Sequence, residues 1–430
     1  MNLRQNLFSM RWSTSILAVA LILAGGVLAS GQEDVIYRFK NPDDGTNPDG
    51  GLISDSAGNL YGTTCGGGPG GYKGAGTVFE LAQQGGEWTK TSIEAFSGGA
   101  GHCPEGNLIF DQAGNLYGVT ADGGTGCGDI GCGTAYELTR QGSTWTYTLI
   151  YAFQGGTTDG QTPAGGLVFD KAGNLYGTSV WGGDPTCQDG CGTGFQLTPS
   201  QGGNWTETVI HFFGRGHDGA KPDASLIVDD KGNLFGTTQL GGTTGNGTVF
   251  KLDAPATQGG VWTEHVLYNL KGMPDGSAPH GALIFDQAGN LDGATISGGS
   301  FYGGTVFQLT RGQDGGWTEN VLHSFCSQSK CADGADPVGG LKFDKAGDLY
   351  GTTSAGFGTV FELAPPTTQG GAWTETVLYD FTSGKDGWGP LAGLTRGKFG
   401  VLYGTTANGG NEGKNCTFNV GCGTVFKIKP

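Results

Sequence analysis

Short runs of alternating apolar and polar or small residues recur along this chain about every 57 residues. Alternation with a period of two is typical of β-strands that bury one face. Each unit has four such runs, separated by turns rich in Gly, Asp and Asn, which favour tight turns. Examples of the four are 281–286, 60–64, 76–81 and 373–379. The pattern predicts an all-β fold with four antiparallel strands per unit.

Seven copies of the unit fill the chain after its first thirty residues. The copies are marked by variants of Gly-Asn-Leu-Tyr-Gly, whose leucines are Leu60, Leu116, Leu175, Leu234, Leu291, Leu349 and Leu402. Four short strands repeated radially are typical of a β-propeller blade. The chain starts at 35–39 with a fourth-strand pattern and ends at 423–428 with a third-strand pattern. Pairing these ends would leave no open edge, so we predict a seven-bladed propeller over 31–430, closed by the N-terminal strand.

The repeat motifs also resemble a known family. The patterns are Gly-Asn-Leu-Tyr-Gly-Thr-Thr, Gly-Gly-x-x-Gly-Thr-Val-Phe-Glu-Leu and Trp-Thr-Glu-Thr-Val-Leu-Tyr. Together they resemble the GloVer tandem repeat of exported bacterial proteins, and the resemblance covers 35–430. It implies export and a repeat architecture, and it supplies no established activity or catalytic residues. This chain departs from the family habit because it has no recognisable C-terminal sorting signal.

The first thirty residues read as a secretory signal peptide. Arg4 and Arg11 precede an apolar run from Ile16 to Leu28, and small residues follow at a cleavage position. A retained anchor is the alternative. Removal of 1–30 takes away two positive charges, so the net charge of −16 becomes −18. Because nucleic acids are bound by Lys and Arg, they are excluded as partners. We expect a monomer that is secreted, on the cell surface or periplasmic.

Ten cysteines in an exported chain predict disulfides. Four pairs are close in sequence, which leaves Cys65 to pair with Cys103. In a four-stranded blade the loops between strands two and three share a face with those between strands four and one. All ten cysteines lie in such loops, and we call this face the top face. The expected pairs are Cys65–Cys103, Cys127–Cys132, Cys187–Cys191, Cys326–Cys331 and Cys416–Cys422.

Six tryptophans open the fourth strands, and we expect them to pack the outer part of the blades rather than to stack on sugars. They are Trp88, Trp145, Trp205, Trp262, Trp317 and Trp373. The repeated position is the reason, because a ligand contact needs one such residue and packing needs one per blade.

Top-face residues are the candidates for ligand binding. Asp-Gly-x-x-Pro precedes the first strand in six units, and we expect its acids near the mouth of the channel. Two roles are open for these aspartates: they bind Ca²⁺, or they accept hydrogen bonds from the backbone of the turn. Histidines of these loops could act as bases or simply face solvent, and loop aromatics could bind sugars or anchor the loops. The candidates are Trp181, Tyr302, Trp388, Asp159, Asp218, Asp275, Asp333, Asp386, His217 and His280, with Asp44 and His102 at equivalent places.

Two function classes remain open. No nucleophile elbow, zinc-protease or phosphate-loop motif occurs in the chain. This favours a non-enzymatic propeller that binds glycans or protein partners through its top face, without a resident cofactor apart from the Ca²⁺ considered above. The alternative is an enzyme acting on extracellular polysaccharide: a lyase, lactonase or glycoside hydrolase. An enzyme needs at least two titratable groups within about 3–6 Å of one point in a cleft, and this geometry distinguishes the two classes.

Overall fold

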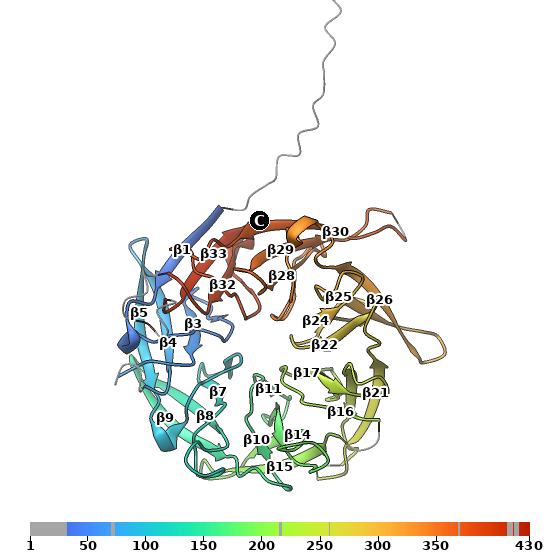
Figure 1. Ribbon diagram of the computed structural model, residues 1–430. Coiled ribbons are helices and arrows are strands. Elements are labelled where there is room, and N and C mark those ends of the chain that lie inside the picture. Colours follow the sequence, from blue (N-terminus) through green and yellow to red (C-terminus); the bar gives the residue numbers. More distant parts are fainter. Residues whose placement is uncertain are drawn as a thin grey trace, which may run out of the picture.

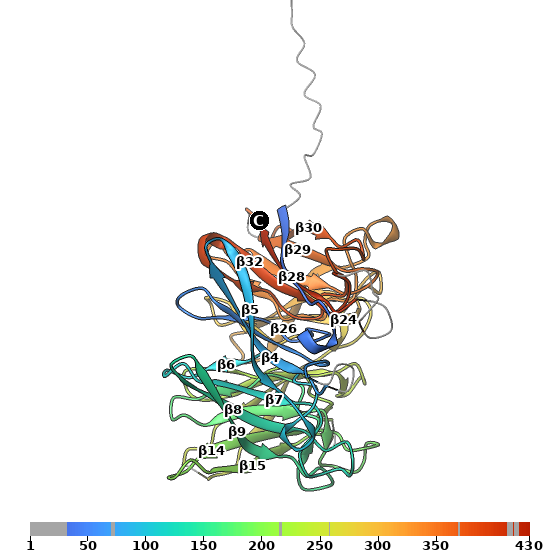
Figure 2. The same cartoon turned by 90° about the vertical axis from the view of Figure 1, so that its left-hand side faces the viewer.

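The chain forms a ring of seven four-stranded antiparallel blades, as predicted (Figure 1). The computed structural model describes residues 32–69, 74–214, 217–257, 259–368, 370–410, 416 and 421–430. The predicted signal peptide lies outside these residues. Figure 2 shows the ring from its edge. None of the described helices has the length and apolar character needed to span a bilayer.

Each blade runs from a short strand at the channel to a long strand at the rim. Blades 1 to 3 are β2 (Ile53–Ser54), β3 (Leu60–Thr64), β4 (Thr77–Gln84) and β5 (Glu87–Ala95); β6 (Ile109–Phe110), β7 (Leu116–Thr120), β8 (Thr134–Gln141) and β9 (Thr144–Ala152); and β11 (Val168–Phe169), β12 (Leu175–Ser179), β14 (Thr193–Pro199) and β15 (Trp205–Phe212).

Blades 4 to 7 repeat this order. They are β17 (Ile227–Val228), β18 (Leu234–Thr238), β20 (Thr248–Asp253) and β21 (Thr263–Asn269); β23 (Ile284–Phe285), β24 (Leu291–Gly298), β25 (Thr305–Arg311) and β26 (Trp317–Ser324); β27 (Lys342–Phe343), β28 (Leu349–Thr353), β29 (Thr359–Ala364) and β30 (Thr374–Asp380); and β31 (Thr395–Arg396), β32 (Leu402–Thr406), β33 (Thr424–Lys429) and β1 (Gln32–Arg38).

Short extra strands and 3₁₀ turns lie in the loops of the ring. The strands are β10 (Gly160–Gln161), β13 (Trp181–Gly182), β16 (Gly219–Ala220), β19 (Leu240–Gly241) and β22 (Gly276–Pro279), and the turns are η1 (Pro42–Asp44), η3 (Gly98–Ala100), η4 (Ser329–Cys331) and η5 (Lys398–Gly400). The strands pair the loop before a blade's first strand with the loop after its second strand, so both loops lie on the top face.

The N-terminal strand closes the ring as the sequence predicts. β1 pairs antiparallel with β33, with Val35 opposite Phe426. The backbone N–H of Phe39 then donates to the Gly423 carbonyl at 3.2 Å, the same bond that Phe96 makes to Gly76 in the next blade. The closing junction therefore has the geometry of an ordinary junction between blades.

A repeated aromatic contact joins neighbouring blades. The Phe39 ring packs edge-on against Phe79 of blade 1, with centroids 5.4 Å apart, and both side chains are fully buried. Phe79 lies opposite Gly62 in the sheet, where an added Cβ would be 2.8 Å from the ring. The glycine of Leu-Tyr-Gly thus leaves room for the phenylalanine. Equivalent ring pairs are Phe96–Tyr136, Phe153–Phe195, Phe213–Phe250, Phe325–Phe361 and Phe381–Phe426.

The fourth-strand tryptophans pack between blades. Trp145 contacts Tyr61 of the preceding blade at 6.2 Å between centroids, and Trp205 contacts Tyr117 at 6.1 Å. The tyrosine belongs to the Leu-Tyr-Gly motif of the second strand. In blade 5 this position is Asp292, which is fully buried. Its Oδ1 accepts from Gln308 at 3.0 Å, while its Oδ2 has no partner among the described residues.

We expect truncation of the closing phenylalanine to be costly. Phe39→Ala removes a fully buried ring at the junction, so the free energy of unfolding should fall by about 3–5 kcal/mol. Phe399→Ala is the control, because this side chain is 95% exposed and its loss should change stability by less than about 0.5 kcal/mol. Urea unfolding measures both, and equal effects would contradict the assigned closure.

The buried Asp292 predicts a pH-dependent loss of stability. Burial raises its pKa to about 7, against about 3.9 in an unfolded chain. The folded state therefore has its full stability below the unfolded-state pKa of about 3.9, and it loses stability as the pH rises from there through about 7. Asp292→Asn should raise the free energy of unfolding by about 2–4 kcal/mol at pH 8 and leave it nearly unchanged at pH 4. Urea titrations at the two pH values test this, and an equal change at both would contradict it.

Candidate functional site

The loops that lead into the first strands are anchored on the preceding blade by proline. An added Cβ on Gly76 would lie 2.5 Å from Cδ of Pro104, so the ring of this proline rests directly on the glycine of the neighbouring blade. All seven junctions have the contact: Gly76–Pro104, Gly133–Pro163, Gly192–Pro222, Gly247–Pro279, Gly304–Pro337, Gly358–Pro390 and Gly423–Pro48. The Gly-x-x-Pro part of the motif therefore fixes the loop in space.

The residue before each proline has a left-handed backbone. Thr162, for example, has φ 56°, and its N–H donates to the Cys132 carbonyl of the preceding blade at 2.8 Å. Left-handed backbone costs non-glycine residues energy and persists where surrounding contacts hold it. The seven positions are Asn47, Cys103, Thr162, Lys221, Ala278, Asp336 and Gly389. The same local turn in every blade sends the residue after the proline toward the channel.

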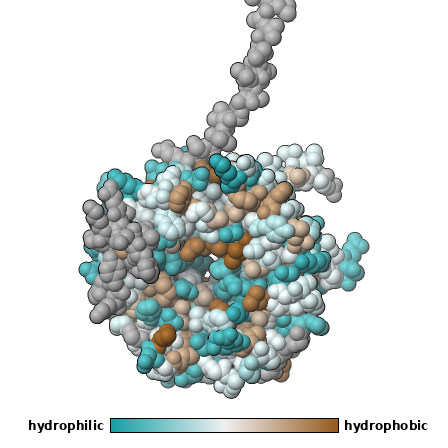
Figure 3. All heavy atoms as spheres, viewed as in Figure 1, coloured by the Kyte–Doolittle hydropathy of each residue, from teal (hydrophilic) through white to brown (hydrophobic). Residues whose placement is uncertain are grey.

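The residues after the prolines line a cavity of about 840 Å³ at the centre of the ring. They are Asp49, Glu105, Ala164, Asp223, His280, Val338 and Leu391. Four are titratable and three are apolar, so the mouth of the channel has a polar part and an apolar part. Apolar residues are visible beside the central opening in Figure 3. We call these seven residues the mouth ring.

Asp223 and His280 form the closest pair in the mouth ring. His280 Nε2 lies 3.1 Å from Asp223 Oδ2, and its Nδ1 lies 3.3 Å from the Val338 carbonyl. Because a carbonyl can only accept, the contact with Val338 favours a hydrogen on Nδ1, and Nε2 lies within hydrogen-bonding distance of the Asp223 carboxyl group. Burial raises the Asp223 pKa to about 6, against the opposing effect of His280. Gln239 Nε2 also donates to Asp223.

Asp49 and Glu105 extend this polar group across the ring. Burial raises the Asp49 pKa to about 7, and the Glu105 charge adds to the rise. Burial likewise raises the Glu105 pKa, with Asp223 adding to the rise and His280 opposing it. Asp49 Oδ1 and Asp223 Oδ1 are buried and have no partner among the described residues. Glu105 thus interacts electrostatically with Asp49 on one side and with Asp223 and His280 on the other, which connects groups from blades 1, 2, 4 and 5.

The mouth ring is not arranged as a ready metal site. Over the described ranges, the one group of three metal-ligating side chains is Cys65, Cys103 and Glu105. Cys65 and Cys103 form a disulfide, so neither offers a thiolate. The mouth ring itself offers carboxyl and imidazole groups, which can donate and accept hydrogen bonds.

The ten cysteines form five disulfides in the top-face loops. The pairs are Cys65–Cys103, Cys127–Cys132, Cys187–Cys191, Cys326–Cys331 and Cys416–Cys422. These are the pairs expected from the sequence. Cys103 is the residue before Pro104, so the disulfide between Cys65 and Cys103 joins blades 1 and 2 directly beside Glu105.

The structure brings two of the proposed binding residues to the mouth. His280 belongs to the mouth ring, and Trp181 lines the same cavity. Lys221 Nζ lies 3.6 Å from the centroid of the Trp181 ring, which is a cation–π contact. Tyr302 is 71% exposed on a blade 5 loop, and Trp388 pairs through its backbone with Asn408 in blade 7. Neither of these two residues lines the cavity.

The repeated aspartates do not lie at the mouth, which corrects the expected placement. Asp159 accepts from the Tyr151 hydroxyl at 2.9 Å, the Gln154 N–H at 2.7 Å and the Gly160 N–H at 2.6 Å. Because its oxygens satisfy donors of the turn and of the preceding outer strand, it faces the junction of the blades. Asp275, Asp333 and Asp386 are also buried and bonded in their turns. Asp218 and His217 line a second cavity of about 520 Å³.

Sequence reasoning missed Asp49, Glu105 and Asp223. A signal was present, because the residue after the proline varies between acid, imidazole and apolar side chains while its neighbours repeat. In a repeat protein the invariant positions maintain the blade, so a variable position beside them marks a candidate functional surface.

Comparison with known proteins places the repeat. A family model described as the Gloeobacter/Verrucomicrobia repeat matches residues 26–184, 125–264 and 256–430. A search of curated proteins finds no match.

Solved structures with TM-scores of at least 0.5 share the fold, and others are similar with lower scores. A Lactobacillus plantarum protein is 16% identical with a TM-score of 0.51, over 77% of this chain and 84% of its own. The extracellular domain of a protein assigned to the hybrid two-component systems of B. thetaiotaomicron is 13% identical with a TM-score of 0.50, over 93% of this chain and 41% of its own. A gluconolactonase of Xanthomonas campestris is 13% identical with a TM-score of 0.42, over 75% and 84%.

Reduction of the disulfides should loosen the top face and leave the ring folded. Each short cross-linked loop contributes roughly 2 kcal/mol in the chain-entropy model, whereas the blade cores contain no cross-link. Limited proteolysis of reduced and oxidised protein should give new cleavage sites in the cysteine-containing loops, with unchanged far-ultraviolet circular dichroism. Global unfolding on reduction would contradict this assignment.

Proposed function

The chain belongs to the Gloeobacter/Verrucomicrobia repeat family, and we propose that it is an exported propeller that binds a glycan at the mouth of its central channel. The observation that carries the proposal is the convergence of Asp49, Glu105, Asp223 and His280 on one cavity, beside Trp181. Every blade supplies one residue to the mouth ring, which gives one continuous recognition surface.

The chemistry of the mouth suits a hydroxylated ligand. Carboxyl and imidazole groups exchange hydrogen bonds with sugar hydroxyls, and Trp181, Val338 and Leu391 offer apolar surface for the C–H faces of a sugar ring. A cavity of about 840 Å³ is within the range of small-molecule sites, about 300–1,000 Å³. Because the chain has a net charge of −16, a neutral or amino sugar fits better than an anionic polysaccharide.

Export is supported by two independent features. The five disulfides suggest an oxidising compartment, and residues 1–30 have the pattern of a secretory signal. The disulfide between Cys65 and Cys103 is two residues from Glu105 of the mouth ring, so it helps to pre-organise this part of the site and to reduce the entropy lost on binding.

A second candidate function, hydrolysis or elimination on an extracellular polysaccharide or lactone, is favoured by one observation. His280 Nε2 and Asp223 Oδ2 lie 3.1 Å apart, and both groups are close enough to Glu105 to influence its carboxyl group. Such a group meets the requirement that titratable side chains converge in one cleft, with His280 or Asp223 as the general acid–base.

Glycan binding should depend on the mouth ring. In a glycan array followed by calorimetry, Asp223→Asn should weaken binding at least about tenfold, because a charge-assisted hydrogen bond of roughly 1.5–3 kcal/mol is lost. Asp230→Asn is the matched control, since Asp230 is fully exposed on the surface and its change alters net charge equally. Equal affinity of the two variants, or no glycan bound by the wild type, would contradict the proposal.

The enzymatic candidate has its own test. The wild type should turn over a polysaccharide or lactone from a substrate panel with a rate that depends on pH between about 6 and 7, and Asp223→Asn should reduce kcat at least about a hundredfold. Glycan binding without turnover supports the binding function alone. Turnover that survives Asp223→Asn contradicts the assigned acid–base pair.

A further inference from the structure

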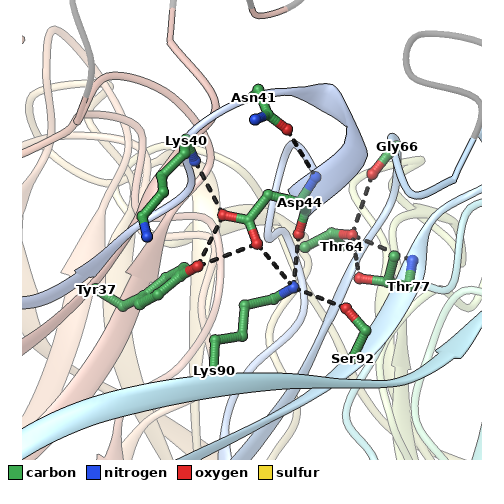
Figure 4. A network of polar contacts seen from close by, with 9 residues as sticks. All are labelled: Tyr37, Lys40, Asn41, Asp44, Thr64, Gly66, Thr77, Lys90 and Ser92. Atoms are coloured by element: carbon green, nitrogen blue, oxygen red, sulfur yellow. Dashed lines mark hydrogen bonds and ion pairs between the residues drawn. The ribbon is translucent and has the colours of Figure 1, made fainter.

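A second ring of polar groups lies at the junctions of the blades, away from the mouth. In blade 1 it consists of Tyr37, Asp44 and Lys90, which Figure 4 shows pointing toward one another. Tyr37 is on the outer strand of blade 7, Asp44 is in the loop that enters blade 1, and Lys90 is on the outer strand of blade 1. The Tyr37 hydroxyl lies 2.8 and 3.0 Å from the two Asp44 carboxylate oxygens.

The Lys90 ammonium is a buried cation held by oxygens. Its Nζ lies 3.1 Å from Asp44 Oδ1, 2.7 Å from the Asp44 carbonyl and 3.0 Å from Ser92 Oγ. The Lys90 side chain is 3% exposed. A carboxylate and a carbonyl therefore share one positive charge at this junction.

Five of the other six junctions have a glutamate where blade 1 has Lys90. The strand register establishes the equivalence, because each of these residues lies opposite the leucine or isoleucine of the third strand, as Lys90 lies opposite Leu81. The pairs of glutamate and loop aspartate are Glu207–Asp159, Glu264–Asp218, Glu319–Asp275, Glu375–Asp333 and Glu33–Asp386.

One carboxylate oxygen of each of these glutamates lacks a hydrogen-bond donor. In all five, Oε1 is inaccessible to solvent and has no partner in the described part of the chain. Burial, and then the charge of the paired aspartate, raises the pKa of Glu207 and Glu319 to about 8. The same causes raise the pKa of Glu375 to about 7. They also raise the pKa of Glu33 and Glu264 to about 7, against the opposing effects of Arg38 and His211 respectively.

The aspartates cannot supply the missing donor, because they are already acceptors. Asp275 accepts from the Tyr268 hydroxyl at 2.9 Å, the Lys271 N–H at 3.1 Å and the Gly276 N–H at 2.6 Å. An ionised aspartate with these partners has no hydrogen to donate. At each of these half-buried junctions the charge of the aspartate acts unfavourably on the glutamate carboxylate, and a cation or a shared proton would relieve this repulsion.

Blade 2 has neither the loop aspartate nor the outer-strand glutamate. Ala100 stands where the other loops have aspartate, and Tyr147 stands where the outer strand has glutamate. The Tyr147 hydroxyl donates to the Ala100 carbonyl at 2.6 Å. The seven junctions therefore follow one rule. If the loop position is aspartate, the outer-strand position is glutamate in five junctions and lysine in one, and if the loop position is not aspartate, the outer-strand position is neither. A positive charge at the junction explains this rule.

We propose that each of the five Glu–Asp pairs binds a Ca²⁺ ion at the place that the Lys90 ammonium occupies in blade 1. The ligands are the glutamate Oε1, the aspartate carboxylate and the aspartate carbonyl, with water completing the oxygen shell that Ca²⁺ prefers. Each ion links the outer strand of one blade to the loop that joins it to the preceding blade. These sites are separate from the mouth ring and do not depend on glycan binding.

Calcium should stabilise the wild-type protein at pH 8. Extracellular calcium modules have dissociation constants of about 10⁻⁴–10⁻³ M, so the thermal unfolding midpoint should rise by several degrees between 1 mM EGTA and about 5 mM CaCl₂. Calorimetric titration should give a stoichiometry of about five. The proposal is overturned if calcium does not shift the midpoint and if stability falls between pH 7 and 8 equally in EGTA and in calcium. This result would indicate a shared proton in place of a calcium ion.

Variants at one junction sharpen the test. Glu207→Gln should lower the stoichiometry by one, and Lys90→Glu should raise it by one because it recreates the acid pair with Asp44. Glu87→Gln is the matched control on the same strand as Lys90, since Glu87 is exposed, and it should leave the stoichiometry unchanged. Asp223→Asn should also keep all five ions, which separates this inference from the proposed function. A stoichiometry that is the same in all variants would overturn the assignment.

Discussion

The whole structure depends on seven equal junctions between blades. A ring closes only if each blade turns the chain by the same angle, so every junction must contain the same contacts. The prolines that rest on the glycines of the preceding blade meet this requirement at all seven junctions. Edge-on aromatic pairs such as Phe39–Phe79 and Phe153–Phe195 meet it at six, and the buried Leu270 takes the place of the first ring at the remaining one. Position 62 and its equivalents are glycine because the aromatic ring opposite occupies the space that a side chain there would need. Repetition of the sequence is the consequence of this constraint.

The constraint also decides where variation is tolerated. Residues that hold a junction change together with their partners: in blade 2 Ala100 and Tyr147 replace both acids of the pair, and in blade 1 Lys90 forms an ion pair with the retained Asp44. The residue after each proline has no part in a junction, so it differs freely among Asp49, Glu105, Ala164 and His280. Structural and functional positions therefore stand next to each other in the same loop, a few residues apart.

The architecture could be predicted from the sequence because its determinants are local and repeated. The fourth-strand pattern at 35–39 and the missing fourth strand after 428 already specify closure, and loop position alone places Cys65 beside Cys103. The site could not be predicted to the same extent. Which side chain of Asp-Gly-x-x-Pro-x faces the channel depends on the left-handed turn at residues such as Asn47 and Thr162. The residue types at these positions do not predict a left-handed turn. The repeated aspartate was therefore expected at the mouth, where the structure has the residue after the proline.

The left-handed turn before each proline has a consequence for how such proteins diversify. Its backbone is held by hydrogen bonds to the preceding blade and by the proline ring, and not by the side chain that follows. Seven codons, widely spaced along the gene, can therefore mutate independently while the scaffold stays intact. Recombination between blades would exchange single mouth-ring residues without a change of strand register. Specificity in this architecture is accordingly a combinatorial property, open to stepwise selection or to a designed library of only seven positions.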